Sequence, residues 1–84
     1  MGKAGIPQLV SREVAQSLRK ERMRLGLSMT QVAERSGLSR QMISYIEQGM
    51  RNPTLDTLLR ITNALNVDLA KLIKRASKAS SAKR

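Results

Sequence analysis

Apolar residues recur at intervals of three and four along most of the chain, which is the spacing of one face of an α-helix. Five such stretches can be separated, at about residues 11–25, 29–35, 40–48, 55–65 and 69–76. No stretch alternates apolar and polar residues as a half-buried strand does, so the pattern predicts an all-α domain. The apolar positions expected to face the core are Val14, Leu18, Leu25, Val32, Ala33, Ile43, Ile46, Leu55, Leu58, Leu59, Ile61, Leu65, Leu69, Leu72, Ile73 and Ala76.

The two central helices carry start and stop signals in their flanking residues. Ser28 precedes the second helix and Gln31 stands at its third position, which together form a capping box. Ser39 can cap the third helix, and Gly49 stands where a left-handed residue would end it. Gly37 lies in the turn between the two helices. Two short capped helices joined by a turn that contains glycine are typical of a helix-turn-helix unit.

Signals at the other boundaries divide the chain into three parts. Thr54 can cap the fourth helix, Asn66 can end it, and Asp68 can cap the fifth. Residues 1–9 contain two glycines and a proline and show no period, so we expect a flexible arm. Residues 77–84 are basic and of low complexity, so we expect a disordered tail. The folded domain is therefore expected at residues 10–76.

Composition excludes several classes of protein. The 84 residues include no cysteine and no histidine, so neither a disulfide framework nor an ordinary zinc site is expected. The six carboxylates are scattered and no glycine-rich phosphate loop is present, so we expect no enzyme, no metal and no cofactor. No apolar run reaches the roughly 18 residues of a membrane span, and no signal peptide opens the chain. We expect a cytoplasmic, nucleoid-associated protein that does not contact membranes.

Charge adds a positive indication of the partner. Sixteen basic and six acidic residues give a formal net charge of +10. Such a charge attracts polyanions, of which nucleic acid is the commonest inside a cell. The excess is uneven: residues 11–70 carry nine basic and six acidic groups, whereas residues 71–84 carry six basic and no acidic groups. The predicted domain is thus mildly basic, and the C-terminal end supplies most of the excess.

A gapless pattern of residues extends over about two thirds of the chain. It consists of Leu18-Arg19, Arg22, Gly26-Leu27-Ser28, Val32-Ala33, Ser36-Gly37-Leu38-Ser39, Ile43-Ser44, Ile46-Glu47, Gly49, Asn52-Pro53, Thr57-Leu58, Ile61 and Ala64-Leu65-Asn66-Val67. This pattern resembles the Cro/repressor-type helix-turn-helix family, also called the xenobiotic-response-element family and typified by lambdoid phage repressors. The resemblance implies a compact five-helix, lambda-repressor-like DNA-binding domain, in agreement with the five helices predicted from periodicity.

The resemblance also implies which residues read DNA. In this family the third helix lies in the major groove with its N-terminal residues at the base edges. Arginine pairs bidentately with guanine and glutamine with adenine, each worth about 1–3 kcal/mol of discrimination. The implied partner is double-stranded DNA. Carried over by position, the base-reading residues are Arg40, Gln41, Met42, Ser44 and Tyr45.

Further roles are implied for residues around the third helix. The family commonly pairs an arginine of the first helix with a glutamate at the end of the third, which here are Arg22 and Glu47. This salt bridge is expected to hold the recognition helix in place. The chain departs from the family at Met29, where a phosphate-binding glutamine is frequent. Phosphate contacts are expected from Ser28, Thr30, Gln31, Arg51 and Asn52.

Dimerisation follows from the small footprint of one recognition helix, about four to five base pairs. The usual arrangement in this family is a two-fold dimer on a palindrome. We therefore expect a homodimer that acts as a sequence-specific transcriptional regulator, most simply a repressor. The candidate interface is the apolar face of the fifth helix, Leu69, Leu72 and Ile73, although the same face could instead pack on the core of its own chain. Regulation by a small-molecule inducer is not expected.

Other functions share this sequence pattern. A protein of the same fold could be a restriction-modification controller, or an antitoxin with a toxin or other protein as partner. It could also be an adaptor that resembles bridging coactivators and holds other proteins with its basic tail. Arg40 and Gln41 favour direct reading of DNA over the adaptor function. A partner gene beside this one would distinguish the remaining alternatives.

Overall fold

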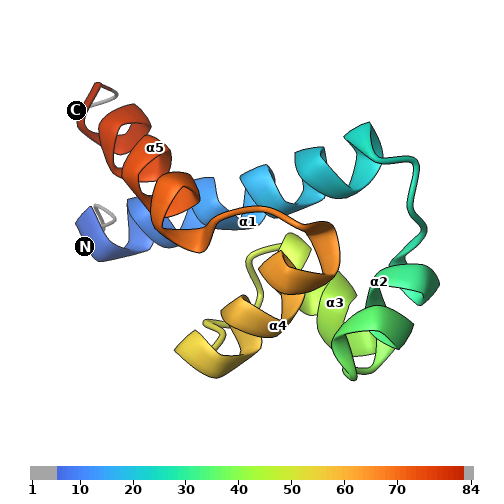
Figure 1. Cartoon of the computed structure of the whole chain (residues 1–84). Helices are drawn as coiled ribbons and strands as arrows, with labels where there is room; N and C mark the ends of the chain where they lie inside the picture. The colour runs from blue at the N-terminus through green and yellow to red at the C-terminus, as the bar shows by residue number, and fades with distance from the viewer. Residues whose placement is uncertain (1–5, 83–84) are drawn as a thin grey trace.

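The computed structural model describes residues 6–82, which fold into five α-helices. Helices α1 and α5 lie together at one side of the molecule, and α2, α3 and α4 gather at the other (Figure 1). This arrangement confirms the predicted all-α, five-helix domain with a central helix-turn-helix. The helices are α1 Ile6–Arg24, α2 Met29–Ser36, α3 Arg40–Glu47, α4 Leu55–Leu65 and α5 Leu69–Ala82.

An aliphatic core joins the helices, as the near absence of aromatic residues requires. Helix α1 packs extensively on α5, and α2 packs on both α3 and α4. Side chains from all five helices meet between these pairs, and the largest fully buried apolar ones are Leu18, Val32, Ile43, Ile46, Leu65 and Leu72. No helix among residues 6–82 combines the length and the apolarity that crossing a bilayer requires.

The predicted limits of α4 and the predicted start of α5 are confirmed by their caps. The Thr54 hydroxyl accepts a hydrogen bond from the backbone N–H of Thr57 at 3.1 Å, at the start of α4. Asn66 ends α4 in a left-handed conformation with φ 57° and ψ 42°. The Asp68 carboxylate accepts from the backbone N–H of Ala70 at 2.9 Å, at the start of α5. Each signal acts within one turn of helix, which is why the sequence alone placed it correctly.

The outer limits of the domain differ from the prediction. Helix α1 begins at Ile6 and α5 continues to Ala82, so residues 6–9 and 77–82 are helical rather than arm and tail. A proline in the first turn, such as Pro7, is compatible with a helix because its missing N–H needs no partner there. Val10 and Ala79 are half-buried, so the packing of α1 on α5 extends both helices. The remainder of the predicted arm and tail lies outside the described residues.

Some predicted core positions are instead accessible to solvent. Leu25 is 41% exposed because α1 ends at Arg24. Leu55 and Leu59 are 64% and 43% exposed, because α4 packs through the other side of its broad apolar stripe. The core takes in Thr62, which is 1% exposed and whose hydroxyl donates to the backbone carbonyl of Leu58 at 3.0 Å. This bond satisfies the buried hydroxyl.

Candidate nucleic-acid interface

Local hydrogen bonds define the helix-turn-helix unit formed by α2 and α3. The Ser28 hydroxyl accepts from the backbone N–H of Gln31 at 3.0 Å, and the Gln31 side-chain carbonyl accepts from the backbone N–H of Ser28 at 2.8 Å. The Ser39 hydroxyl accepts from the backbone N–H of Met42 at 3.0 Å and caps α3. Between the helices, Gly37 adopts φ 74°, a region in which other residues are strained. The sequence thus sets both the start of α3 and the turn that leads to it.

Helix α3 has one buried and one outward face. Ile43 and Ile46 are each 1% exposed and anchor the helix in the core. Arg40 and Gln41 are exposed on its first turn, and Tyr45 is partly exposed one turn later. Because the anchors fix the rotation of the helix about its axis, the outward face presents residues that the sequence predicted to read bases.

Contacts within α3 and with the loop that follows it order this outward face. The Gln41 side-chain amide N–H donates to the Tyr45 hydroxyl at 2.7 Å, and the Arg51 guanidinium carbon lies 5.3 Å from the centroid of the Tyr45 ring. The Gln48 side-chain amide donates to the Ser44 hydroxyl at 3.0 Å. Gln41 keeps a second N–H and a carbonyl oxygen, which are the two groups needed to pair with adenine. The face is therefore partly organised before any ligand binds.

A bidentate ion pair ties the end of α3 to α1. Arg22 donates from Nε to Glu47 Oε2 at 2.7 Å and from Nη2 to Glu47 Oε1 at 3.0 Å. Its remaining guanidinium nitrogen Nη1 donates to the backbone carbonyl of Leu27 at 2.9 Å. The side chains of Arg22 and Glu47 are only 12% and 5% exposed. The hydrogen bonds with Glu47 raise the pKa of Arg22 above its ordinary value.

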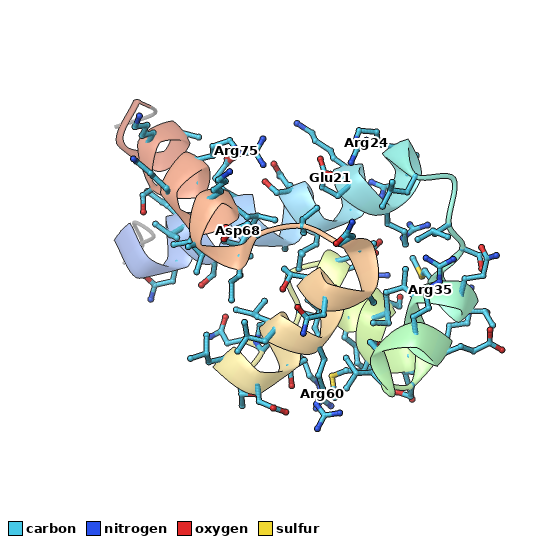
Figure 2. All side chains as sticks on the ribbon, in the orientation of Figure 1. Glu21, Arg24, Arg35, Arg60, Asp68 and Arg75 are labelled. Carbon is cyan, nitrogen blue, oxygen red and sulfur yellow. The ribbon has the colours of Figure 1, made fainter. Side chains whose placement is uncertain are left out.

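The outward face of α3 is electropositive. Glu47 is the one acidic residue of α3, and its ion pair with Arg22 holds it away from solvent. Arg40 and Arg51 are exposed on and beside the helix. Other ion pairs among the described residues lie elsewhere; Glu21 and Arg24, for example, project near the C-terminal end of α1 (Figure 2). The surface that would face DNA therefore combines hydrogen-bond donors with positive charge.

The predicted phosphate-binding residues flank α3 in the chain and are exposed. Gln31 uses its side-chain carbonyl in the capping box, which leaves its N–H groups to donate to a phosphate oxygen. Met29 and Met42 are half-buried and pack against the core. Met29 thus has a packing role where the family often has glutamine, and Met42 keeps only part of its side chain accessible for the predicted base contact. The exposed phosphate candidates are Ser28, Thr30, Gln31, Arg51 and Asn52.

The predicted dimer interface requires correction. Leu69 and Leu72 are 8% and 1% exposed within a single chain, so neither offers appreciable surface to a partner. Ile73 is the half-buried residue of the predicted set, and it lines a surface groove together with the small exposed part of Leu69. The alternative stated from the sequence, that this face of α5 packs on its own core, accounts for both leucines. Periodicity identifies an apolar face but does not say which element covers it.

A five-helix fold and an ordered, electropositive α3 define a DNA-binding helix-turn-helix domain. A helix-turn-helix family model matches residues 18–72. The chain belongs to the helix-turn-helix family of Cro/repressor type, whose members are transcriptional regulators rather than enzymes. The resemblance seen in the sequence is therefore confirmed.

Similar proteins include both regulators and control proteins. An uncharacterized HTH-type transcriptional regulator of Mycobacterium tuberculosis is 42% identical over 59 residues, and the match spans 70% of this chain but 42% of that protein. Control protein C.SmaI of Serratia marcescens is 42% identical over 62 residues, 74% of each chain. The crystal structure of the wild-type restriction-modification controller protein C.Esp1396I superposes with a TM-score of 0.72 at 31% identity, over 83% of this chain and 91% of that one. This chain thus spans less than half of the mycobacterial relative.

Proposed function

We propose that this chain is a dimeric transcriptional repressor that reads a palindromic operator with α3 in the major groove. The observation that carries the proposal is the outward face of α3, where Gln41, Tyr45 and Arg51 are ordered by mutual contacts and no carboxylate is exposed. Solubility alone does not require so many hydrogen-bond donors to be held in fixed orientations on one face of a helix.

The chemistry of this face matches a short base sequence. Arg40, exposed on the first turn of α3, can donate two hydrogen bonds to the O6 and N7 atoms of guanine. Gln41 can pair with the N6 and N7 atoms of adenine through the groups that its bond to Tyr45 leaves available. The Tyr45 hydroxyl accepts from Gln41 and keeps its own proton for a neighbouring base or phosphate. The remaining proposed base-reading residues are Ser44 and the accessible part of Met42.

Selection of bound sequences from a random pool of double-stranded DNA tests this function. The expected result is one enriched palindrome whose half-sites lie about one helical turn apart, 10–10.5 base pairs between centres. A guanine and an adenine at adjacent positions of each half-site would match Arg40 and Gln41. Recovery of a pool without sequence enrichment would overturn the proposal and favour an adaptor.

We place the dimer contact at the corner between α4 and α5, but on residues other than the buried leucines of α5. Leu55 and Leu59 are exposed there beside a groove that Val67 and Ile73 also line. Exposed leucines at a groove supply the apolar area that a symmetric interface needs.

A pair of matched variants tests this contact. Leu59→Asp introduces a charge at the proposed interface, and Leu25→Asp introduces the same charge at a leucine of nearly equal exposure elsewhere, 43% against 41%. Sedimentation velocity should show a monomer for Leu59→Asp and a dimer for Leu25→Asp. A dimer in both variants would refute this interface without affecting the reading of DNA by α3.

Control of a restriction-modification system is the second candidate function. It is favoured by the 42% identity to C.SmaI, which extends over 74% of each chain, and by the fold shared with C.Esp1396I. The operator obtained from the random pool distinguishes this candidate. Its presence upstream of restriction endonuclease and methyltransferase genes would support it, and its presence only before unrelated genes would exclude it.

A further inference from the structure

A groove of about 750 Å³ lies between the first half of α1, the loop that follows α3, and the facing parts of α4 and α5. This volume is within the range of about 300–1,000 Å³ typical of small-molecule sites. The groove lies between segments distant in the sequence, so no local pattern could have indicated it, and from the sequence we expected no regulation by a small molecule. None of the functions assigned to α3 uses its interior.

The lining of the groove divides into an apolar wall and a cationic edge. Val10, Val14 and Leu58 contribute to the wall. Among the residues that the structure describes, the charged ones that line the groove are Arg12 and Arg51, and no carboxylate lines it. Neither arginine forms an ion pair with a carboxylate among the described residues, whereas Arg22, Arg24 and Arg60 each do. The edge of the groove therefore has uncompensated positive charge next to apolar surface.

We propose that this groove binds a small amphiphilic carboxylate, with its aliphatic chain on the apolar wall and its carboxylate on Arg51 and Arg12. A carboxylate matches the planar donor pattern of a guanidinium and can accept two parallel hydrogen bonds from it. An aliphatic chain of several carbons gains free energy by covering Val10, Val14 and Leu58. A cationic or neutral amphiphile would gain only the second of these terms.

Occupation of the groove would act on the DNA-binding face through Arg51. The guanidinium of Arg51 stacks on Tyr45, whose hydroxyl holds the Gln41 side chain at 2.7 Å. A charge-assisted hydrogen bond to carboxylate is stronger than a cation–π contact at an exposed site, so the ligand would draw Arg51 toward the groove. Tyr45 and Gln41 would then lose a neighbour that orders them, and the DNA would lose a phosphate contact. This consequence rests on the proposed reading of DNA by α3.

Titration of the full chain with sodium octanoate, followed by amide chemical shifts, tests the site without DNA. Saturable shifts are expected around residues 10–14 and 49–52. Shortening the chain to hexanoate should weaken binding by roughly an order of magnitude, since each buried methylene contributes about fourfold. Octylamine should not shift these residues. Equal affinity for octanoate and acetate would show non-specific anion binding and would overturn the proposal, as would equal affinity for octylamine.

Arginine variants assign the carboxylate. Arg51→Gln and Arg12→Gln should each weaken octanoate binding by about tenfold, the loss of one charge-assisted hydrogen bond. Arg35→Gln removes the same charge from an exposed position on α2 that does not line the groove, and should leave the affinity within about twofold. Ser11→Trp, at an exposed lining position, should block the groove while leaving the core intact. Undiminished binding in Ser11→Trp, or equal losses in all three arginine variants, would refute the site.

The effect on DNA is measured separately with the operator selected from the random pool. Saturating octanoate should lower the affinity of the wild type for the operator by about tenfold. In Arg51→Gln, saturating octanoate should change the affinity by less than about twofold relative to the same variant without octanoate. Octanoate that binds the groove without changing operator affinity would overturn the coupling through Arg51. Failure of the random pool to enrich any sequence would refute the proposed function, while the titration without DNA would still decide whether the groove binds a carboxylate.

Discussion

The ion pair between Arg22 and Glu47 allows a sharp test of how α3 is held. In Glu47→Gln the side chain keeps its shape but loses its charge. Arg22, whose side chain is 12% exposed in the native chain, is then left with at most a neutral acceptor in place of a bidentate carboxylate. Removing one partner of a buried pair typically costs about 3–5 kcal/mol. We expect the lower end, about 3 kcal/mol, because the residual exposure admits water and the bond of Arg22 to the Leu27 carbonyl remains.

A loss of this size is a large fraction of the total stability of a small domain, roughly 5–15 kcal/mol. Urea unfolding followed by far-ultraviolet circular dichroism measures the loss of stability directly. The slope of the free energy of unfolding against urea concentration should stay unchanged if the folded state stays compact. Asp56→Asn is the matched control, since it breaks the ion pair between Asp56 and Arg60. The side chains of these two residues are 73% and 52% exposed, respectively. That variant should change stability much less, because exposed pairs are solvated and screened.

The double variant Arg22→Met with Glu47→Leu separates the net value of the pair from the cost of an unmatched charge. Replacing both partners with apolar residues of similar size often costs little, so most of the stability lost in Glu47→Gln should return. The reasoning would be refuted if Glu47→Gln were no more destabilising than Asp56→Asn. It would also be refuted if the double variant lost as much stability as Glu47→Gln and Arg22→Met together.

Three further predictions concern reading, turn geometry and pH. Gln41→Ala should relax specificity at one or two base positions in a repeated pool selection, whereas a uniform loss for every sequence would contradict direct reading. Gly37→Ala should lower the free energy of unfolding by about 1–2 kcal/mol through backbone strain at φ 74°, because the added methyl group meets only Arg60 Nη1, at an ordinary 3.7 Å. The hydrogen bond from Arg24 lowers the pKa of Glu21 in the folded chain. On acidification Glu21 is therefore protonated first in the unfolded chain, and the free energy of unfolding should fall as the pH approaches the lowered pKa. Urea midpoints between about pH 6 and pH 3 should show a shallower decline in Arg24→Gln, and identical declines would contradict the assignment.

The sequence by itself determined that the chain forms five helices and where the inner boundaries between them lie. Caps at Ser28, Ser39 and Thr54, and the left-handed residues Gly37 and Asn66, act within about one turn of helix. Such signals are complete in a short window, so they could be interpreted without knowing the fold. The pairing of Arg22 with Glu47 spans 25 positions and was predicted only through the family resemblance.

The candidate site was partly predictable for the same reason. The outward face of α3 follows from the spacing of Ile43 and Ile46, and the bond between Gln41 and Tyr45 joins residues four apart. The stacking of Arg51 on Tyr45 depends on the path of the loop after α3, which the sequence leaves open. The same loop forms one side of the groove that we assign to a carboxylate.

Only the tertiary structure decided which apolar residues are covered. Leu55 and Leu59 belong to the same stripe of α4 as Leu65, yet the first two are exposed and the last is 2% exposed. Leu72 is buried by its own chain rather than offered to a partner. A periodic pattern specifies that a helix has an apolar face. How much of that face is covered by other helices depends on where those helices cross it. Those crossings bring together residues far apart in the chain, and their energies are therefore absent from any local window of sequence.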